Sequence, residues 1–367
     1  VYSDAELTHY MRTAVEFAQT PSGQSIQPGA HTANKPTISD THPLLIDRFL
    51  EDATEVDVDC ITDGETTVIG AIMEHIEEAG IHSGDSACVI PPFSLTPPMR
   101  DRLRDAAKKL AKALSVRGLM NMQLAVKGDD LYVIEVNPRA SRTAPFVSKA
   151  IGVPLPKLAA KIMAGKTLKE LGFTQEVIPT HYSVKEAVFP FSKFPGVDII
   201  LGPEMKSTGE VMGIDPDLGL AFAKSQMAAG GALPTKGNVF ISVKESDKPN
   251  VARIAKGYAD LGFTLYATPG TGQVISEAGI PVNILPKLAS GQRPNVIDLM
   301  KNKDMALVIN TPSGKNTRED EVKIRTATMQ NRIPIMTTLR GADMALKAIK
   351  SLQVSEVQVR ALQEYHK

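Results

Sequence analysis

The sequence has few cysteines, no excess of either charge and no long apolar run, and each absence excludes a class of protein. Cys60 and Cys88 are the only cysteines, and neither belongs to a CxxC motif. The sequence therefore offers no disulfide framework and no thiolate metal site. Lysine plus arginine and aspartate plus glutamate both number 41, so the formal net charge is zero. Without a basic excess we expect neither a nucleic acid nor an anionic membrane as partner.

The ends and the length of the chain support further expectations. No apolar stretch reaches membrane-spanning length, and the start Val1-Tyr2-Ser3-Asp4 lacks a basic-then-apolar signal sequence. We expect two reduced thiols in a cytoplasmic protein. The chain also lacks an initiator methionine, so we expect a fragment of a longer protein. A chain of 367 residues is long enough for two or three domains.

The most informative stretch is Leu119–Arg142, LMNMQLAVKGDDLYVIEVNPRASR. Two alternating, mostly apolar runs, Leu119–Val126 and Leu131–Asn137, flank the turn-forming residues Gly128-Asp129-Asp130. This pattern predicts an antiparallel hairpin.

Oxygen-bearing side chains converge on one face of this hairpin. Glu135 and Asn137 are two residues apart, so both leave the same face of their strand. If Lys127 pairs with Leu131 across the turn, Gln123 falls opposite Glu135. Such oxygen donors suit Mg²⁺, which takes its remaining ligands from water and phosphates. The alternative is a solvated hairpin face, and spacing alone does not separate the two.

A basic loop follows the hairpin. Arg139 and Arg142 flank Ser141 ahead of a predicted helix at Pro145–Ile151. Arginine is well shaped for two parallel hydrogen bonds to a phosphate and is charged at every relevant pH. Alone, two loop arginines are ordinary surface charge. Directly after candidate metal ligands, they favour contact with a transferred phosphoryl group and indicate an ATP-dependent enzyme.

Long, ordered blocks of the sequence resemble one family. The blocks are IEVNPRASRTAPFVSKAIGVPL, MEHIEEAGIHSGDSACVIPP, VRGLMNMQLAV and LGPEMKSTGEVMG. Together they are similar to the C-terminal part of the large subunit of glutamine-dependent carbamoyl-phosphate synthetases. The resemblance implies a partial α+β ATP-grasp domain over residues 1–231, followed by an α/β methylglyoxal-synthase-like allosteric domain with a parallel sheet over 232–367. It also implies that residues 20–41, rich in Pro, Gly, Ser and Thr, are a flexible insertion, and that the family's lid and first subdomain lie upstream.

The resemblance assigns the candidate catalytic site. It implies ATP contacts from Arg48, Leu50, Glu55, Gly80, Ile81, His82, Ser83, Gln123 and Glu135. It implies Mg²⁺ or Mn²⁺ held by Gln123, Glu135 and Asn137, with Arg139 and Arg142 as catalytic residues and K⁺ as a further cofactor. Independently of the family, the run Thr54–Cys60 places three acidic residues on one strand face, which predicts that this face meets solvent.

After Gly230-Gly231, strands and helices alternate at a pitch that predicts a parallel sheet covered on both sides. Hydroxyl- and glycine-bearing loops at 268–271, 310–314 and 337–338 end three of these strands. They suit an anion, or each is simply the cap of a helix. The resemblance implies a regulatory nucleotide, uridine monophosphate, at Thr268, Thr271, Lys287 and Asn310, with Lys236 as an additional position. Pro312 departs from the family pattern and leaves the effector's identity open. Ornithine is implied at Glu77, Asp85, Glu186 and Thr337.

The implied activity is ATP-dependent phosphorylation of carbamate to carbamoyl phosphate, for pyrimidine and arginine biosynthesis. A glutaminase small subunit is the implied partner, and the full enzyme is expected to be an oligomer. One alternative is a module that senses nucleotide and ornithine without catalysis. Another is a different ATP-grasp ligase, such as a biotin carboxylase or a purine-pathway enzyme. Methylglyoxal synthase activity is not expected, because no paired-acid loop is evident.

Overall fold

The computed structural model describes residues 8, 50, 53–194, 198–312 and 319–367. The chain divides into two compact units, Val1–Phe49 and Leu50–Lys367, and every element discussed below belongs to the second. The expected insertion at 20–41 and the candidate ATP contact Arg48 lie outside the described residues.

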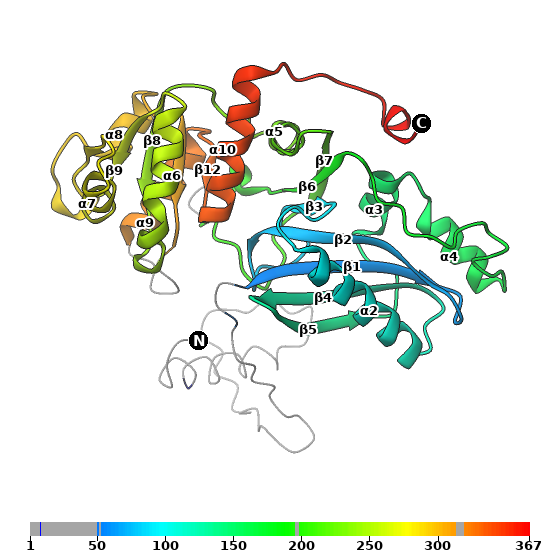
Figure 1. The fold of residues 1–367 in the computed structure, drawn as a ribbon. Helices are drawn as coiled ribbons and strands as arrows, with labels where there is room; N and C mark the ends of the chain where they lie inside the picture. The colour runs from blue at the N-terminus through cyan, green and yellow to red at the C-terminus, as the bar shows by residue number, and fades with distance from the viewer. Residues whose placement is uncertain (1–7, 9–49, 51–52, 195–197, 313–318) are drawn as a thin grey trace, which may run out of the picture. The chain divides into compact units, whose positions relative to one another are not determined.

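A seven-stranded sheet in the order β5-β4-β1-β2-β3-β6-β7 forms the first part of this unit (Figure 1). All of its neighbouring strands run antiparallel. The strands are β1 Thr54–Thr62, β2 Thr67–Glu78, β3 Cys88–Ile90, β4 Gly118–Lys127, β5 Asp130–Asn137, β6 Tyr182–Val188 and β7 Gly209–Asp215.

Helices pack on both faces of this sheet. Helix α2, Pro97–Ala113, covers one face, where Leu103 packs with Val56 and Val58 of β1. Helices α3, Ala144–Ile151, and α4, Leu155–Met163, pack with Ile61 on the other face. Because side chains alternate along a strand, Glu55, Asp57 and Asp59 point to the α3 and α4 side. Helices α3 and α4 pack on one end of this face of the sheet, and a cavity that contains the candidate site lies at the other end.

The hairpin forms as predicted, but its register differs. Lys127 pairs with Asp130, so the connection has two residues, and Gly128 takes a positive φ of 60° at the first of them. This arrangement suits a two-residue hairpin loop with glycine first. A bulge after Gln123 then restores the predicted pairing of Gln123 with Glu135. The Lys127–Leu131 pairing, the condition from which the Gln123–Glu135 pairing was deduced, does not form, because the sequence pattern did not reveal the extra residue in the ladder.

The second sheet has five parallel strands in the order β10-β9-β8-β11-β12. They are β8 Asn238–Ser242, β9 Thr264–Ala267, β10 Asn283–Ile284, β11 Leu307–Asn310 and β12 Ile335–Met336. Helices α6 Lys248–Asp260, α7 Pro269–Glu277 and α10 Leu339–Val354 pack on one face. Helices α8 Val296–Lys301 and α9 Glu319–Gln330 pack on the other. The predicted fold class, an α+β part followed by an α/β part with a parallel sheet, is confirmed.

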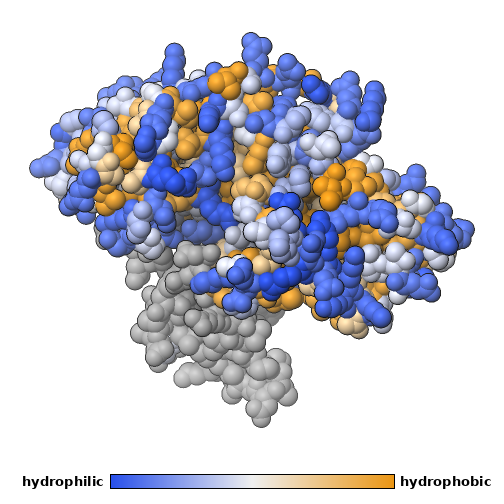
Figure 2. Space-filling view, viewed as in Figure 1, coloured by the Kyte–Doolittle hydropathy of each residue, from blue (hydrophilic) through white to orange (hydrophobic). Residues whose placement is uncertain are grey.

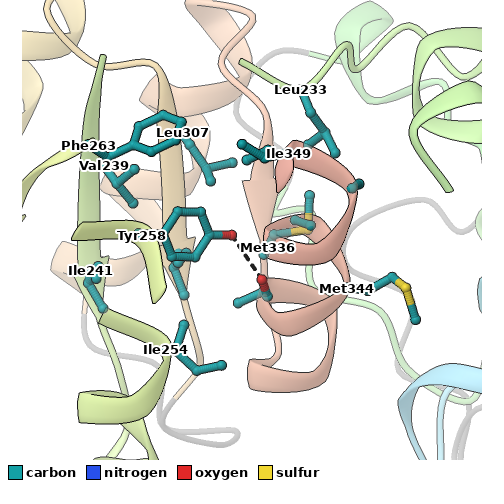
Figure 3. Packing of buried hydrophobic residues seen from close by; sticks show 14 of the residues in the cluster. Leu233, Val239, Ile241, Ile254, Tyr258, Phe263, Leu307, Met336, Met344 and Ile349 are labelled. Carbon is teal, nitrogen blue, oxygen red and sulfur yellow. Dashed lines mark hydrogen bonds between the residues drawn. The ribbon is translucent and has the colours of Figure 1, made fainter. Parts of the chain in front are cut away.

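One apolar core contains side chains from both sheets. It joins Val89 and Val184 of the first sheet to Val239 and Ile241 of the second, through α5, Leu218–Ala228, and α10. Figure 3 shows its centre, where the hydroxyl of Tyr258 donates 2.9 Å to the carbonyl oxygen of Ala342. The predicted boundary after Gly231 falls between the two sheets, and the division into domains there stays a prediction.

The remaining elements are short, and the surface is mixed. The 3-10 helices are η1 Phe191–Lys193, η2 Glu245–Asp247, η3 Leu288–Ser290 and η4 Leu362–His366. On the face drawn in Figure 2, hydrophilic side chains predominate and apolar ones form patches between them. Within the described part of the chain, no helix has both the length and the apolar character needed to cross a membrane.

Candidate functional site

A cavity of about 540 Å³ opens on the α3 and α4 side of the first sheet. Its size falls in the usual range for small-molecule sites, about 300–1,000 Å³. Several strands and loops that are distant in sequence line it together. The predicted residues that line it are Glu55, Gly80, Ile81, His82, Ser83, Gln123, Glu135, Asn137, Arg139 and Arg142. Leu50 is half-buried and does not line the cavity.

The acidic face of β1 is buried, and two of its residues, Glu55 and Asp57, line the cavity. Glu55, Asp57 and Asp59 are exposed by only 4%, 1% and 3%. The predicted solvent-facing side was therefore wrong, because β1 is a central strand and its polar face is covered by the neighbouring loops. Burial raises the pKa of Glu55, and it raises that of Asp59 to about 6.

Asp59 holds the loop that contains Arg142 in place through hydrogen bonds. Its carboxylate accepts hydrogen bonds from Asn121 Nδ2 at 2.9 Å, Ser141 Oγ at 3.0 Å and Thr143 Oγ1 at 2.7 Å. These bonds hold the residues on both sides of Arg142. The exposed guanidinium groups of Arg139 and Arg142 line the cavity, and neither pairs with a carboxylate among the described residues. Both are available to an anionic ligand.

The candidate metal ligands present oxygens at the β4–β5 edge of the cavity. Gln123 donates from Nε2 to Ser83 Oγ at 2.9 Å, which leaves its Oε1 available. Asn137 Oδ1 accepts a long 3.4 Å hydrogen bond from Arg139. In the described ranges no group of three or more His, Cys, Asp or Glu could hold a metal ion. A set with Glu135 as its one carboxylate fits Mg²⁺ only together with ligand phosphates, which is the usual arrangement at nucleotide sites.

The loop after β2 borders the same cavity. Gly80 has a φ of 97°, where a side chain would be strained, and its amide donates to Glu55 Oε2 at 3.3 Å. The Nδ1 atom of His82 accepts from the amide of Gly84 at 3.0 Å, so a neutral ring carries its proton on Nε2. The amide of His82 donates to the carbonyl oxygen of Gly202 at 2.8 Å, which connects the loop to the 198–209 segment.

Lys185 on β6 is a cavity residue that the sequence analysis missed. Its side chain is 1% exposed, and its ammonium donates to the carbonyl oxygens of Ser83, Gly84 and Ser86 at 3.1, 3.3 and 2.6 Å. It therefore fixes the backbone of the loop that contains His82 and Ser83. A lysine inside the strand sequence YSVKEAV was a signal, because a charged residue in a buried strand needs partners.

The predicted nucleotide-effector residues mostly gather at the carboxyl ends of the parallel strands. Thr268 and Thr271 follow β9, Lys287 follows β10, and Asn310 ends β11. Thr268 Oγ1 donates to Ser242 Oγ at 3.2 Å and Thr271 Oγ1 accepts from the amide of Val243 at 3.2 Å. Lys236 precedes β8 and so lies at the amino ends, which separates it from the others.

The loop interpretation at 268–271 was wrong, because helix α7 begins at Pro269 and includes three of these four residues. Thr268 occupies the N-cap position, but its side chain makes no cap hydrogen bond. At the third loop the capping alternative is confirmed for Thr338, whose Oγ1 accepts from the amide of Gly341 at 2.9 Å.

Of the predicted ornithine residues, Glu77 and Glu186 are close enough for their charges to interact. Burial, and then the charge of Glu77, raise the pKa of Glu186 to about 8. Asp85 is differently engaged, since its two oxygens accept the amides of Lys206 and Ser207 at 2.7 and 3.0 Å. Thr337 is half-buried directly after β12.

Comparison with known proteins shows the class to which this chain belongs. Residues 20–171 match the family model "Carbamoyl-phosphate synthase L chain, ATP binding domain", and residues 250–337 match "MGS-like domain". The class is thus an ATP-grasp protein that carries an MGS-like domain. A solved "Biotin Carboxylase domain of single-chain bacterial carboxylase" is 22% identical, with a TM-score of 0.40, over 50% of this chain and 48% of that one.

The relatives narrow the class to one family. The large chain of carbamoyl phosphate synthase from Rhodopirellula baltica is 56% identical over 89% of this chain and 30% of its own length. That of Pseudomonas aeruginosa is 51% identical over 100% of this chain and 32% of its own. The "Carbamoyl phosphate synthase large chain, C-terminal section" of Methanocaldococcus jannaschii is 49% identical over 99% of this chain and 57% of its own. The chain belongs to the carbamoyl phosphate synthase large-chain family and spans about a third of the full-length relatives.

Proposed function

We propose that this chain is the part of a carbamoyl phosphate synthase large chain that phosphorylates carbamate with ATP, a ligase function. One observation carries the proposal: the candidate ATP, metal and phosphoryl residues within the described ranges, Leu50 excepted, line a single cavity. The names of the relatives favour this reaction over that of another ATP-grasp ligase.

The residues have distinct roles in this proposal. A carbamate oxygen attacks the γ-phosphorus of ATP, the bond to the β,γ-bridging oxygen breaks, and ADP leaves. Such a transfer depends on alignment and charge neutralisation more than on covalent catalysis. Arg139 and Arg142 hold the transferred group, while Glu55 and the backbone from Gly80 to Ser83 position the nucleotide.

The donor set suits the cations implied by the family. Gln123, Glu135 and Asn137 would hold Mg²⁺ or Mn²⁺, which neutralises phosphate charge when bound. One of the buried oxygens without a hydrogen-bond partner among the described residues, Asp57 Oδ1, belongs to a residue that lines the cavity. An unpartnered carboxylate oxygen of this kind would suit the additional cation, K⁺.

The second sheet supports regulation as part of the proposal. Thr268, Thr271, Lys287 and Asn310 would take uridine monophosphate, and Glu77, Glu186 and Thr337, with Asp85, would take ornithine. Pro312 keeps the identity of the nucleotide open. A glutaminase small subunit would supply ammonia, in a cytoplasmic oligomer serving pyrimidine and arginine biosynthesis.

The second candidate function is a sensing module that binds effectors but does not catalyse. The observation that favours it is the independent set of polar residues at the carboxyl ends of the second sheet. It differs from the first candidate in one measurable property, because it requires no affinity for ATP.

Calorimetric titration of this chain with Mg-ATP, uridine monophosphate and ornithine separates the candidates. We expect Mg-ATP to bind and binding to be lost in Arg142→Ala, with Lys108→Ala as the control on the exposed face of α2. Binding of the effectors without Mg-ATP would favour the sensing module. If none of the three ligands binds, the site assignments are wrong.

Ornithine affinity should rise about tenfold between about pH 6.5 and pH 8. The pKa of Glu186 is raised from 4.5 to about 8, so its carboxyl is protonated over most of that pH range. Because the unfolded chain loses this proton at lower pH, the stability that the protonated carboxyl contributes is lost as the pH rises toward about 8. A cationic ligand favours the ionised form and is bound more tightly as the proton leaves. Calorimetry at several pH values measures this, and Glu186→Gln should bind weakly with little pH dependence. A flat profile in the unmodified chain contradicts the assignment.

A further inference from the structure

Arg325 of α9 is a fully buried arginine. Its contacts link the part of the chain that contains the first sheet to the part that contains the second. Its side chain is 0% exposed. The guanidinium donates to both carboxylate oxygens of Asp198, from Nε and Nη2 at 2.7 Å each. Its third nitrogen, Nη1, donates to Asn310 Oδ1 at 3.0 Å and lies 3.8 Å from Glu321. Asp198 follows β6 of the first sheet, whereas Asn310 ends β11 of the second.

This contact is geometrically demanding. A planar guanidinium that uses two nitrogens on one carboxylate fixes both distance and orientation. Although burial raises the pKa of Asp198, the hydrogen bonds and charge of Arg325 hold it below the ordinary value. Removing either partner would leave the other as a buried, poorly compensated charge. The positions of Asp198 and Asn310 are therefore interdependent.

Both polar atoms of the Asn310 side chain contact the protein. Its Nδ2 donates to the carbonyl oxygen of Ser242 at 3.2 Å while its Oδ1 accepts from Arg325, and its side chain is 0% exposed. A ligand that donates to Oδ1 competes directly with Arg325. A ligand that turns the amide toward itself, to accept from the second Nδ2 hydrogen, moves Oδ1 away from Arg325.

The segment that begins at Asp198 ends at the cavity. Its Gly202 carbonyl oxygen accepts the amide of His82 at 2.8 Å. The amides of Lys206 and Ser207 donate to Asp85 in the same loop. Met205 lines the cavity beside Arg142. A displacement at Asp198 is thus connected by hydrogen bonds to the backbone around His82.

We propose that Arg325 is a positioning residue that couples the nucleotide-effector site at Asn310 to the ATP loop at His82, through the segment 198–207. The inference rests on the proposed function, because it needs an effector at Asn310 and a nucleotide at His82. It requires that the Arg325 contacts have two arrangements and that the bound effector stabilises one of them more than the other.

Hydrogen exchange measured by mass spectrometry on this chain, with and without uridine monophosphate, tests the coupling. In the unmodified chain the effector should change the exchange of amides at 199–207 and at 82–86. In Asp198→Asn, which keeps the shape and removes the charge, the effector should bind within about threefold of its original affinity, with those changes reduced at least fivefold. Asp343→Asn is the matched control, since it removes a carboxylate paired with the exposed Arg253 and should leave the changes intact.

The outcomes are distinguishable. If the effector binds and the exchange changes persist in Asp198→Asn, or are absent in the unmodified chain, the coupling is wrong while the effector site stands. If the effector does not bind the unmodified chain, the effector assignment fails and the coupling with it. Should Asp198→Asn not fold, Arg325→Lys provides the same comparison, because it keeps the buried charge but loses the planar fork.

Discussion

Replacing Glu135 by glutamine in the full-length large chain, assembled with its small subunit, should slow carbamate-dependent ADP formation about a thousandfold. Glu135 is the one carboxylate among the proposed metal ligands, and it lies opposite Gln123 across the hairpin. Glutamine keeps the size and one oxygen but removes the negative charge that attracts a divalent cation. Steady-state ADP release, measured over a range of Mg²⁺ and Mn²⁺ concentrations, is the readout.

The matched control is Asp130→Asn, which removes a negative charge from the exposed start of the same strand, at a residue that does not line the cavity. It should retain near-normal turnover. Glu135→Gln should also need more Mg²⁺ to reach its residual rate, a shift that a purely structural defect would not produce. Turnover within a few-fold of normal in Glu135→Gln would remove Glu135 from the metal site.

Lys185→Met should lower the free energy of unfolding by about 3 kcal/mol and weaken Mg-ATP binding at least tenfold. The substitution leaves the carbonyl oxygens of Ser83, Gly84 and Ser86 without their shared donor in a buried place. Methionine relieves the cost of burying an ammonium, which offsets part of the loss. The weakened carbonyl contacts nevertheless dominate. Gly84 keeps only a long 3.5 Å bond from Ser207 Oγ and Ser86 only a weak one from Cys88 Sγ, and a lost partner costs about 1–3 kcal/mol.

Urea unfolding and calorimetry on this chain measure the two effects. Lys157→Met, at an exposed position of α4, is the control and should change neither quantity measurably. Lys185→Arg provides a second comparison, because it keeps the charge and should retain more stability than Lys185→Met. Equal stability and equal ATP affinity in Lys185→Met and the unmodified chain would show that Lys185 does not hold the loop.

The hairpin was predictable because its determinants are local. Glycine in the turn and alternation on both sides identify a hairpin without knowledge of the rest of the chain. The Gln123–Glu135 pairing was also predicted, although from a register that is one residue off at the turn and corrected by the bulge. Bulges depend on how a strand meets its neighbours, so local pattern does not place them.

Burial was the property that the sequence pattern misjudged. Alternation in β1 placed Glu55, Asp57 and Asp59 on one face, but it could not tell a face that meets solvent from one that lines a cavity. The difference comes from β2 and β4 on either side of β1 and from the loop at Ser141–Thr143. Those neighbours are supplied by distant segments.

The sequence by itself indicated the family, the hairpin, the helix after it, the alternation of strands and helices after Gly231, and most residues that line the cavity, because long matched blocks and local periodicity carry that information. Only the tertiary structure revealed Lys185 beneath the loop of Ser83–Ser86, the separation of Lys236 from the other proposed effector residues, and the link from Asn310 through Arg325 to Asp198. Arg325 lies 127 residues from Asp198 in the chain. Contacts at such separations depend on how whole sheets and helices pack, and no local pattern encodes them.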